Sequence, residues 1–161
     1  MPFTTADLCD KFSDNENFHI AEPIFRHYGG SPKFSGQITT LKLFEDNSWV
    51  RKTLEEKVES RVLVVDGGGS HRCALLGDQL AQLACDNGWN GVIVYGCIRD
   101  SAEIDQMPIG VRALHTHPLK SHKKGVGDKD VLITFAGVNF RNNQYLYADQ
   151  DGIIVSGTAL D

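Results

Sequence analysis

The sequence lacks the features that mark secreted and membrane-spanning proteins. Among its 161 residues there is no long apolar run, and acidic residues appear early in the N-terminal stretch MPFTTADLCDKF. We therefore expect neither a signal peptide nor a membrane span, and a cytoplasmic location. The four cysteines lie far apart without a CxxC pair, so their spacing indicates neither a zinc site nor a redox dithiol.

The sequence also lacks an excess of positive charge. Its formal charge is -5, whereas nucleic-acid binders normally present a basic face, so we expect no direct contact with nucleic acid. The one locally basic segment is KSHKKG, residues 120–125, which we interpret as a solvated loop. The composition, 41% hydrophobic and 23% charged, is typical of a globular protein, and the length predicts a single domain over residues 1–161.

The spacing of apolar residues predicts an α/β fold. Capping residues followed by apolar residues at helical spacing predict helices over residues 4–12, 47–59 and 76–88. Short apolar runs predict strands over residues 36–44, 62–65 and 91–95. The last two strands flank the third helix, and such a βαβ unit implies parallel neighbouring strands joined by a right-handed crossover.

The remaining regions have a different character. Residues 13–36 are rich in glycine, proline and polar side chains, so we expect an irregular segment there. Beyond residue 101, turn sequences separate short strand candidates, which are GVRALHTH, VLITFAGVNF, QYLYAD and GIIVSG. We expect a largely antiparallel β section to follow the parallel unit.

A glycine-rich turn, VVDGGGS, follows the strand of residues 62–65. Such a turn can cradle a phosphate, a nucleotide or adenosylmethionine, but Gly67, Gly68 and Gly69 are consecutive and lack the spaced glycine fingerprint. A structural turn is favoured, because glycine tolerates positive φ. A glycine-lined floor for a small ligand is a third interpretation.

The start of the third helix is a candidate carboxylate site. Its first amides have no partner within the helix, and the residues concerned are Gly77, Asp78, Gln79 and Leu80. The alternative is that Asp78 merely caps the helix. In a βαβ unit this helix start lies at the same sheet edge as the end of the next strand.

That next strand ends in Arg99 and Asp100, which allow two interpretations. Adjacent opposite charges can form a structural ion pair. Alternatively, Asp100 binds a divalent cation while the planar fork of Arg99 binds an anionic substrate. Glu103 can then bind water coordinated to that metal. The histidines of HTHP, His115 and His117, lack the partners of a closed zinc site and are favoured as core or loop residues.

Six segments in fixed order resemble the RraA-like family. They are VVDGGGS, ALLGD, NGW, GVIVYGCIRD, THP and YADQDGIIVS. This family includes the regulator of ribonuclease E activity A and class II 4-hydroxy-4-methyl-2-oxoglutarate aldolases, and some members have carried menaquinone methyltransferase names. The resemblance covers nearly the whole chain, from TTADLCD through GIIVS.

The resemblance implies a domain of the swivelling β/β/α type, assembled as a homotrimer with active sites between subunits. It implies a divalent metal, Mg²⁺ or Mn²⁺, and lyase chemistry on 2-oxo acids: aldol cleavage of 4-hydroxy-4-methyl-2-oxoglutarate and decarboxylation of oxaloacetate. The aldolase motif, an aspartate followed by twenty residues and Arg-Asp, matches Asp78, Arg99 and Asp100. Asp100 would then bind metal, Arg99 would bind substrate, and the amides from Gly77 to Leu80 would hold its carboxylate. We add the hypothesis that Asp78 orients a proton-relaying water.

Two further expectations come from the same resemblance. The alternative function is a non-catalytic regulator that binds and inhibits ribonuclease E, where an acidic trimer would complement a basic partner. Longer aldolases of this group carry an additional C-terminal segment that supplies an acidic residue to a neighbouring subunit's site. Because this chain ends at Asp161, we expect that contribution to be missing.

Overall fold

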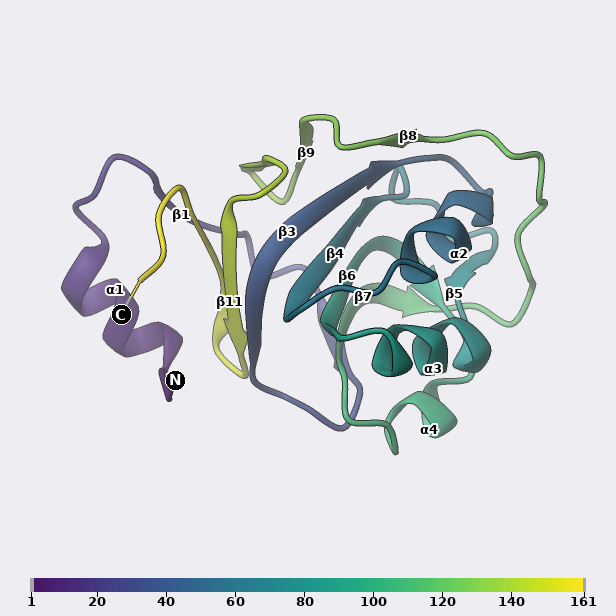
Figure 1. Ribbon diagram of the computed structural model, residues 1–161, viewed down its shortest axis with the longest axis horizontal. Coiled ribbons are helices and arrows are strands. Elements are labelled where there is room, and N and C mark those ends of the chain that lie inside the picture. The colour runs from purple at the N-terminus through teal and green to yellow at the C-terminus, as the bar shows by residue number, and fades with distance from the viewer. Residues whose placement is uncertain (1, 161) are drawn as a thin grey trace.

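The computed structural model describes residues 2–160 and shows an α/β fold (Figure 1). Its helices are α1 (Thr5–Phe12), α2 (Ser48–Leu54), α3 (Asp78–Asp86) and α4 (Ser101–Ile104). Within the described residues, no helix has the length and apolar character needed to cross a membrane. The mixed sheet that these helices accompany confirms the predicted fold class.

Four parallel strands form the centre of the main sheet. In spatial order they are β3 (Phe34–Lys42), β4 (Arg61–Asp66), β6 (Trp89–Ile98) and β7 (Gly110–Thr116). The connection from β4 to β6 contains α3, which confirms the predicted βαβ unit. Because parallel strands point the same way, their carboxyl ends meet at one edge of the sheet.

Shorter strands extend both sides of this centre. Beyond β3 lie three antiparallel strands: β11 (Tyr145–Asp149), β12 (Gly152–Ser156) and β1 (Phe18–Ile20). The strand β2 (Arg26–Tyr28) pairs antiparallel with β7, β5 (Ala74–Leu76) pairs with the end of β6, and β8 (Asp128–Lys129) pairs with β3. A separate hairpin consists of β9 (Ile133–Phe135) and β10 (Val138–Phe140).

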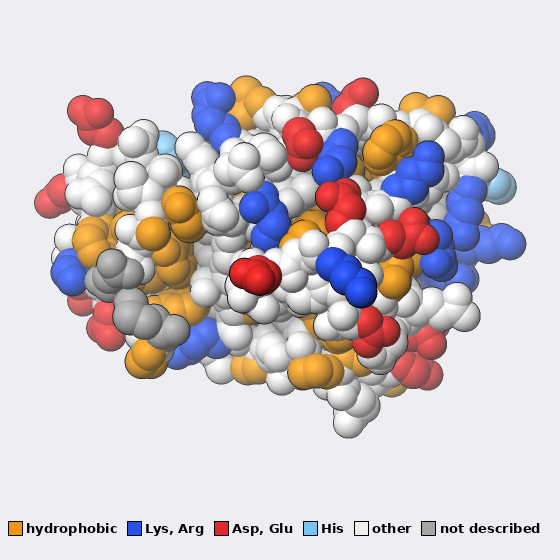
Figure 2. Space-filling view, in the orientation of Figure 1, with side chains coloured by type: hydrophobic (Ala, Val, Ile, Leu, Met, Phe, Trp, Pro, Cys, Tyr) orange, Lys and Arg blue, Asp and Glu red, His pale blue; other side chains and the backbone are white. Residues whose placement is uncertain are grey.

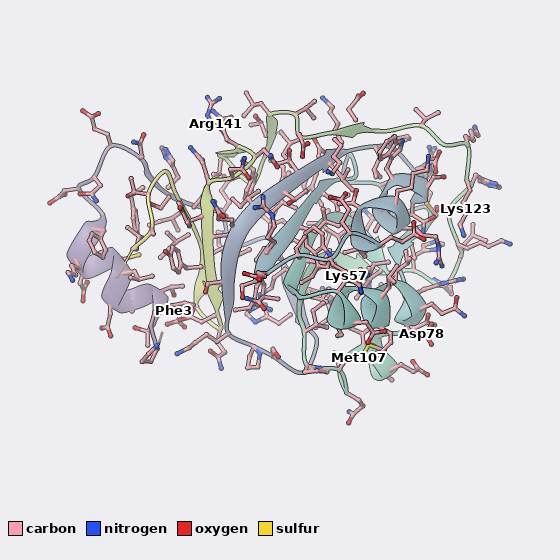
Figure 3. The ribbon with its side chains drawn as sticks, in the orientation of Figure 1. Phe3, Lys57, Asp78, Met107, Lys123 and Arg141 are labelled. Atoms are coloured by element: carbon pink, nitrogen blue, oxygen red, sulfur yellow. The ribbon has the colours of Figure 1, made fainter. Side chains whose placement is uncertain are left out.

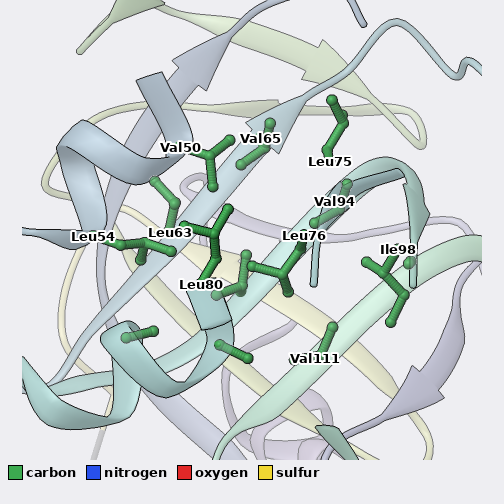
Figure 4. Close-up of a cluster of buried hydrophobic side chains, with 14 of the residues drawn as sticks. Val50, Leu54, Leu63, Val65, Leu75, Leu76, Leu80, Val94, Ile98 and Val111 are labelled. Carbon is green, nitrogen blue, oxygen red and sulfur yellow. The ribbon is translucent and has the colours of Figure 1, made fainter. Parts of the chain in front are cut away.

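The central strands are buried on both faces, which explains their continuous apolar sequence. In β4, Leu63 and Val65 point toward the helices, whereas Val62 and Val64 point toward the β9–β10 hairpin. Figure 4 shows the helical side, where Leu63 lies among side chains of α2, α3 and β6. Each such Val or Leu contributes roughly 1.5–3 kcal/mol relative to an exposed position.

The structure corrects three predicted boundaries. The second helix ends at Leu54 instead of residue 59, because residues 55–60 bond to the chain after α3; the Trp89 indole N–H, for example, donates to the Glu56 carbonyl. The third helix begins at Asp78 instead of residue 76, because residues 74–76 form strand β5. The segment 13–36 is not wholly irregular, since it contains the edge strands β1 and β2, whose mostly exposed side chains give no apolar alternation.

Candidate active site

The two candidate segments lie side by side at the carboxyl edge of the sheet. Strand β5 leads directly into α3 and runs parallel to the end of β6, with Leu76 opposite Ile98. The Arg99 N–H donates to the Leu76 carbonyl over 2.9 Å. Asp78 at the start of α3 is thereby held next to Arg99 and Asp100, although 20 residues separate it from that pair in the sequence.

These residues line a cleft of about 150 Å³. All the predicted carboxylate-binding and metal-binding residues except one are in its wall, and they are Gly77, Asp78, Gln79, Leu80, Arg99 and Asp100. The exception is Glu103, which is exposed on α4 and lies outside the wall. Of the three predicted carboxylates, Asp78 and Asp100 therefore share the cleft wall, whereas Glu103 does not.

The Asp100 carboxylate is fixed by the start of α3. Its Oδ2 accepts a hydrogen bond of 3.0 Å from the Asp78 N–H. Its backbone is left-handed (φ 58°, ψ 39°), a conformation that Asp tolerates better than most residues and that turns the chain sharply after β6. This bond uses one of the amides predicted to hold the substrate carboxylate, so the first-turn amides that remain are those of Gln79 and Leu80.

Gly77 permits the close approach of the two segments. A Cβ at this position would lie 2.9 Å from Asp100 Oδ2 and 3.5 Å from Arg99 Nε. Its φ of -126° is open to any residue, so space and not backbone conformation requires glycine here. The Asp100 side chain therefore lies against the space that a side chain at position 77 would need.

Three cationic residues in the cleft wall were missed by the sequence analysis. They are Arg51 from α2 and Lys120 and Lys123 from the basic segment of residues 120–125. Figure 3 shows Lys123 and Asp78 at the same end of the molecule, and Figure 2 shows Lys and Arg side chains gathered there. The interpretation of KSHKKG as a purely solvated loop was incomplete, since Lys120 and Lys123 are exposed but line the cleft. Its run of positive charge was the available signal.

Asp46 fixes the position of this loop. Its side chain is 3% exposed and accepts hydrogen bonds from the N–H groups of Lys124 and Val126 and from both donors of Ser48. Burial by itself would raise the pKa of Asp46, but the bonds from Ser48, Val126 and Lys124 outweigh it and lower the pKa to about 2. A single ionised carboxylate thus ties the loop to the start of α2.

Asn47 completes the wall between α2 and the loop. Its amide Nδ2 donates to the Leu75 carbonyl over 3.3 Å, and its backbone N–H donates to the Ser121 hydroxyl. Its buried Oδ1 accepts no hydrogen bond from the described residues. Asn47 is the N-cap residue of α2, but its side chain makes no capping hydrogen bond, and Asp46 accepts the bond from the Ser48 N–H instead.

The glycine-rich turn is structural. The N–H groups of Gly67 and Gly69 both donate to the Tyr95 carbonyl, and Gly68 and Gly69 have positive φ. A Cβ on Gly68 would meet the Phe44 ring at 2.6 Å, and one on Gly69 would meet the Tyr95 ring at 3.3 Å. An alanine at either position would therefore be strained by the positive φ and crowded by a neighbouring ring, which accounts for the glycines without a ligand.

The histidines of the HTHP segment accept hydrogen bonds from nearby backbone N–H groups. The Thr116 N–H donates to His115 Nδ1, and the Leu119 N–H donates to His117 Nδ1. Across residues 2–160, no group of three or more His, Cys, Asp or Glu side chains has the geometry of a metal site. A closed zinc site formed by these histidines is thus unsupported in the described chain.

The cleft nevertheless suits a hard divalent cation held largely by water. Asp100 Oδ2 is engaged with the Asp78 N–H, whereas Oδ1 accepts no hydrogen bond from the described residues. Mg²⁺ commonly binds through one or two carboxylates and keeps several waters, and Asp100 and Asp78 are the carboxylates in this part of the cleft wall. Cationic neighbours oppose a free cation there, and an anionic ligand would offset that repulsion.

Comparison with known proteins identifies the family. A family described as RraA-like, Aldolase/RraA, matches residues 5–155. A Methylococcus capsulatus protein named "Putative 4-hydroxy-4-methyl-2-oxoglutarate aldolase" is 64% identical over 97% of both chains. A relative from Dechloromonas aromatica with the same name is 60% identical over 99% of both.

Two solved structures share the fold over nearly their full length. One is titled as an S-adenosylmethionine: 2-dimethylmenaquinone methyltransferase from Geobacillus kaustophilus, with a TM-score of 0.95, 53% identity and coverage of 98% of this chain and 97% of that one. The other is titled as the RNA-processing inhibitor RraA from Thermus thermophilis, with a TM-score of 0.94, 42% identity and coverage of 100% and 96%. The chain therefore belongs to the RraA-like family.

Proposed function

We propose that this protein is a divalent-metal-dependent lyase acting on pyruvyl compounds. Its reactions would be aldol cleavage of 4-hydroxy-4-methyl-2-oxoglutarate and decarboxylation of oxaloacetate, both of which leave pyruvate. One observation carries the proposal: Asp100, Arg99 and the start of α3 share one cleft wall. The names of relatives at 60% and 64% identity support the same reaction class.

The chain's own residues would bind and orient the substrate. Its C1 carboxylate would accept hydrogen bonds from the Gln79 and Leu80 amides at the positive end of α3. Arg99 would face the 2-oxo oxygen, where negative charge develops as the carbon–carbon bond breaks. A cation at Asp100, Mg²⁺ or Mn²⁺, would supply Lewis-acid stabilisation of that charge.

Asp78 would mediate proton transfer during aldol cleavage. Its side chain is half-buried in the cleft wall while its backbone N–H holds Asp100, so its position is coupled to that of the proposed metal ligand. A carboxylate in this place can orient a water that takes the proton from the 4-hydroxyl group and returns one to the pyruvyl carbon.

The charge of the cleft supports a dianionic substrate. Four cationic side chains (Arg51, Arg99, Lys120 and Lys123) face two carboxylates (Asp78 and Asp100), so the formal excess is two positive charges. Both proposed substrates carry two carboxylates. Lys120 and Lys123, whose side chains are flexible, would bind the distal carboxylate of the substrate as point charges. We extend the proposal to a cytoplasmic homotrimer, in which a neighbouring subunit covers the open side of the cleft.

Pyruvate release is the direct test. Purified protein would be incubated with each substrate, first with Mg²⁺ and then with chelator, and we expect turnover that chelator abolishes. Asp100→Ala should abolish metal-dependent turnover, and Arg99→Ala should lower kcat/KM by roughly 10²–10³-fold. Glu103→Gln is the matched control, because Glu103 is exposed and outside the cleft wall. Absence of turnover with both substrates would refute the proposal.

Methyl transfer receives no support from the glycine-rich turn. The methyltransferase title belongs to the Geobacillus structure. In this chain Gly67, Gly68 and Gly69 are consecutive, so the turn lacks the spaced glycine fingerprint of a nucleotide-binding loop.

A second candidate function is inhibition of ribonuclease E. Likeness to the Thermus RNA-processing inhibitor at 42% identity favours it, and the net charge of -5 suits a basic protein partner. Binding to ribonuclease E at micromolar concentration, unchanged in Asp100→Ala, would show a surface function separate from the cleft. No detectable complex at that concentration would count against it.

A further inference from the structure

A second cavity, of about 330 Å³, shares no residue with the candidate active site. It lies between the segment that joins β1 to β2 and the turn between β11 and β12. Its apolar wall includes Ala21, Phe25 and Ile153, which belong to or pack against the core on the side of the β9–β10 hairpin. Cavities of this size are at the lower end of those that bind small molecules.

Arg112 is a buried charged residue in the wall of this cavity. The residue is 1% exposed, so its charged side chain is removed from solvent. A buried charge is costly unless it is paired and fully hydrogen-bonded. At neutral pH the guanidinium remains protonated, since burial lowers the pKa of Arg112 only to about 10.

No carboxylate of the described residues forms an ion pair with Arg112. Its Nη2 donates to the carbonyls of Pro32 and Asp149, and Nη1 makes a longer bond of 3.3 Å to the Val111 carbonyl. Its buried Nε donates no hydrogen bond to any of the residues 2–160. The Asp149 carboxylate attracts Arg112 and raises its pKa, which partly offsets the effect of burial, but both of its oxygens accept hydrogen bonds from Thr5 and it forms no ion pair with Arg112.

The surroundings of Arg112 define the ligand further. His27 on β2 lies opposite Arg112 on β7 and also lines the cavity. Two exposed acidic residues, Glu22 and Asp151, belong to the wall as well, and they disfavour a ligand with several negative charges. The Glu22 carboxyl group lies near the β9–β10 turn. Its carbon is 3.3 Å from the position that a Cβ added to Gly137 would occupy.

We propose that this cavity binds a small monocarboxylate with a short apolar body. The carboxylate would pair with the Arg112 guanidinium, whose fork of donors matches a carboxylate. Because Arg112 is only 1% exposed and its Nε is buried, the side chain would shift toward the cavity to present the unpartnered Nε–H. The apolar body would contact Phe25, Ala21 and Ile153. This site is independent of the proposed lyase activity, because it uses none of the residues of the cleft.

Butyrate and its neutral analogue butyramide are suitable probes. Calorimetric titration of the wild-type protein should give a Kd on the order of 1 mM for butyrate and no saturation with butyramide. Amide chemical shifts should locate butyrate by perturbing residues around His27, Arg112 and Ile153. Shifts confined to residues 77–80 and 99–100 would instead place it in the cleft and overturn the proposal.

Three variants separate the two sites. Arg112→Met should weaken butyrate binding at least tenfold, and Ala21→Leu, which enlarges a cavity-wall side chain without touching the charge, should weaken it similarly. Arg99→Met should leave it unchanged. Should Arg112→Met fail to fold, Ala21→Leu and the chemical shifts of the wild type still decide the matter. Unchanged affinity in Ala21→Leu, equal loss in Arg99→Met, or no saturable binding by the wild type would overturn the proposal.

Discussion

Replacing Gly77 by alanine should lower kcat/KM while leaving the free energy of unfolding nearly unchanged. The added Cβ would lie 2.9 Å from Asp100 Oδ2, whereas ordinary van der Waals contact begins at 3.4 Å. Asp100 must therefore move by about 0.5 Å, the difference between these two distances. The movement strains its 3.0 Å hydrogen bond from the Asp78 N–H and displaces the proposed metal ligand from the start of α3.

The effect on activity should be the larger one. Misplacement of a reacting group by about 1 Å can cost about 10²-fold in rate, so a shift of half that size predicts a loss of roughly tenfold in kcat/KM. Stability should change little. A weakened hydrogen bond costs about 1 kcal/mol, and the lower chain entropy of alanine in the unfolded state returns about 0.4–1 kcal/mol where φ is permissive, as it is at Gly77.

Pyruvate release with Mg²⁺ and urea unfolding would measure the two effects. Gly152→Ala is the matched control, because the same change there meets no atom within 4 Å. Titration with Mn²⁺ would show whether metal affinity falls together with activity. If Gly77→Ala kept kcat/KM within twofold of the wild type, the inference that Asp100 must lie against Gly77 to act would be refuted.

Three other predictions concern the loop, its anchor and the core. The double variant Lys120→Ala/Lys123→Ala should raise KM roughly tenfold with a much smaller change in kcat, and added salt should reduce the difference from the wild type. Asp46→Ala should lower the free energy of unfolding by roughly 3 kcal/mol at pH 7. Because the folded-state pKa of Asp46 is lowered from 3.8 to about 2, its contribution is present above pH 3.8 and lost as the pH falls toward 2, so urea unfolding of variant and wild type should converge there. Leu63→Ala should cost about 2–5 kcal/mol by leaving a cavity in the core, as thermal unfolding would show.

Local sequence patterns were sufficient for the central strands β3, β4 and β6 and for the motif at their ends, but they assigned GVRALHTH to a largely antiparallel section, whereas β7 pairs parallel with β6. Strand β4 is apolar on both faces, so its burial can be predicted without knowing its neighbours. The spacing between Asp78 and Arg99 spans one helix and one strand, and a βαβ unit brings its two ends to one sheet edge. The short strands β1 and β2 escaped prediction, because only pairing with β12 and β7 makes them strands.

The sequence by itself determined the α/β fold and placed Asp78, Arg99 and Asp100 at one sheet edge, because periodicity and the order of elements are local properties of the chain. Its resemblance to the RraA-like family came from six matching segments. Only the tertiary structure decided that Lys120 and Lys123 face the cleft and that Arg112 is buried without a carboxylate partner. These positions depend on contacts between segments far apart in the sequence, such as that of Asp46 with residues 124 and 126. Such contacts exist only once the chain has closed, and no local pattern specifies them.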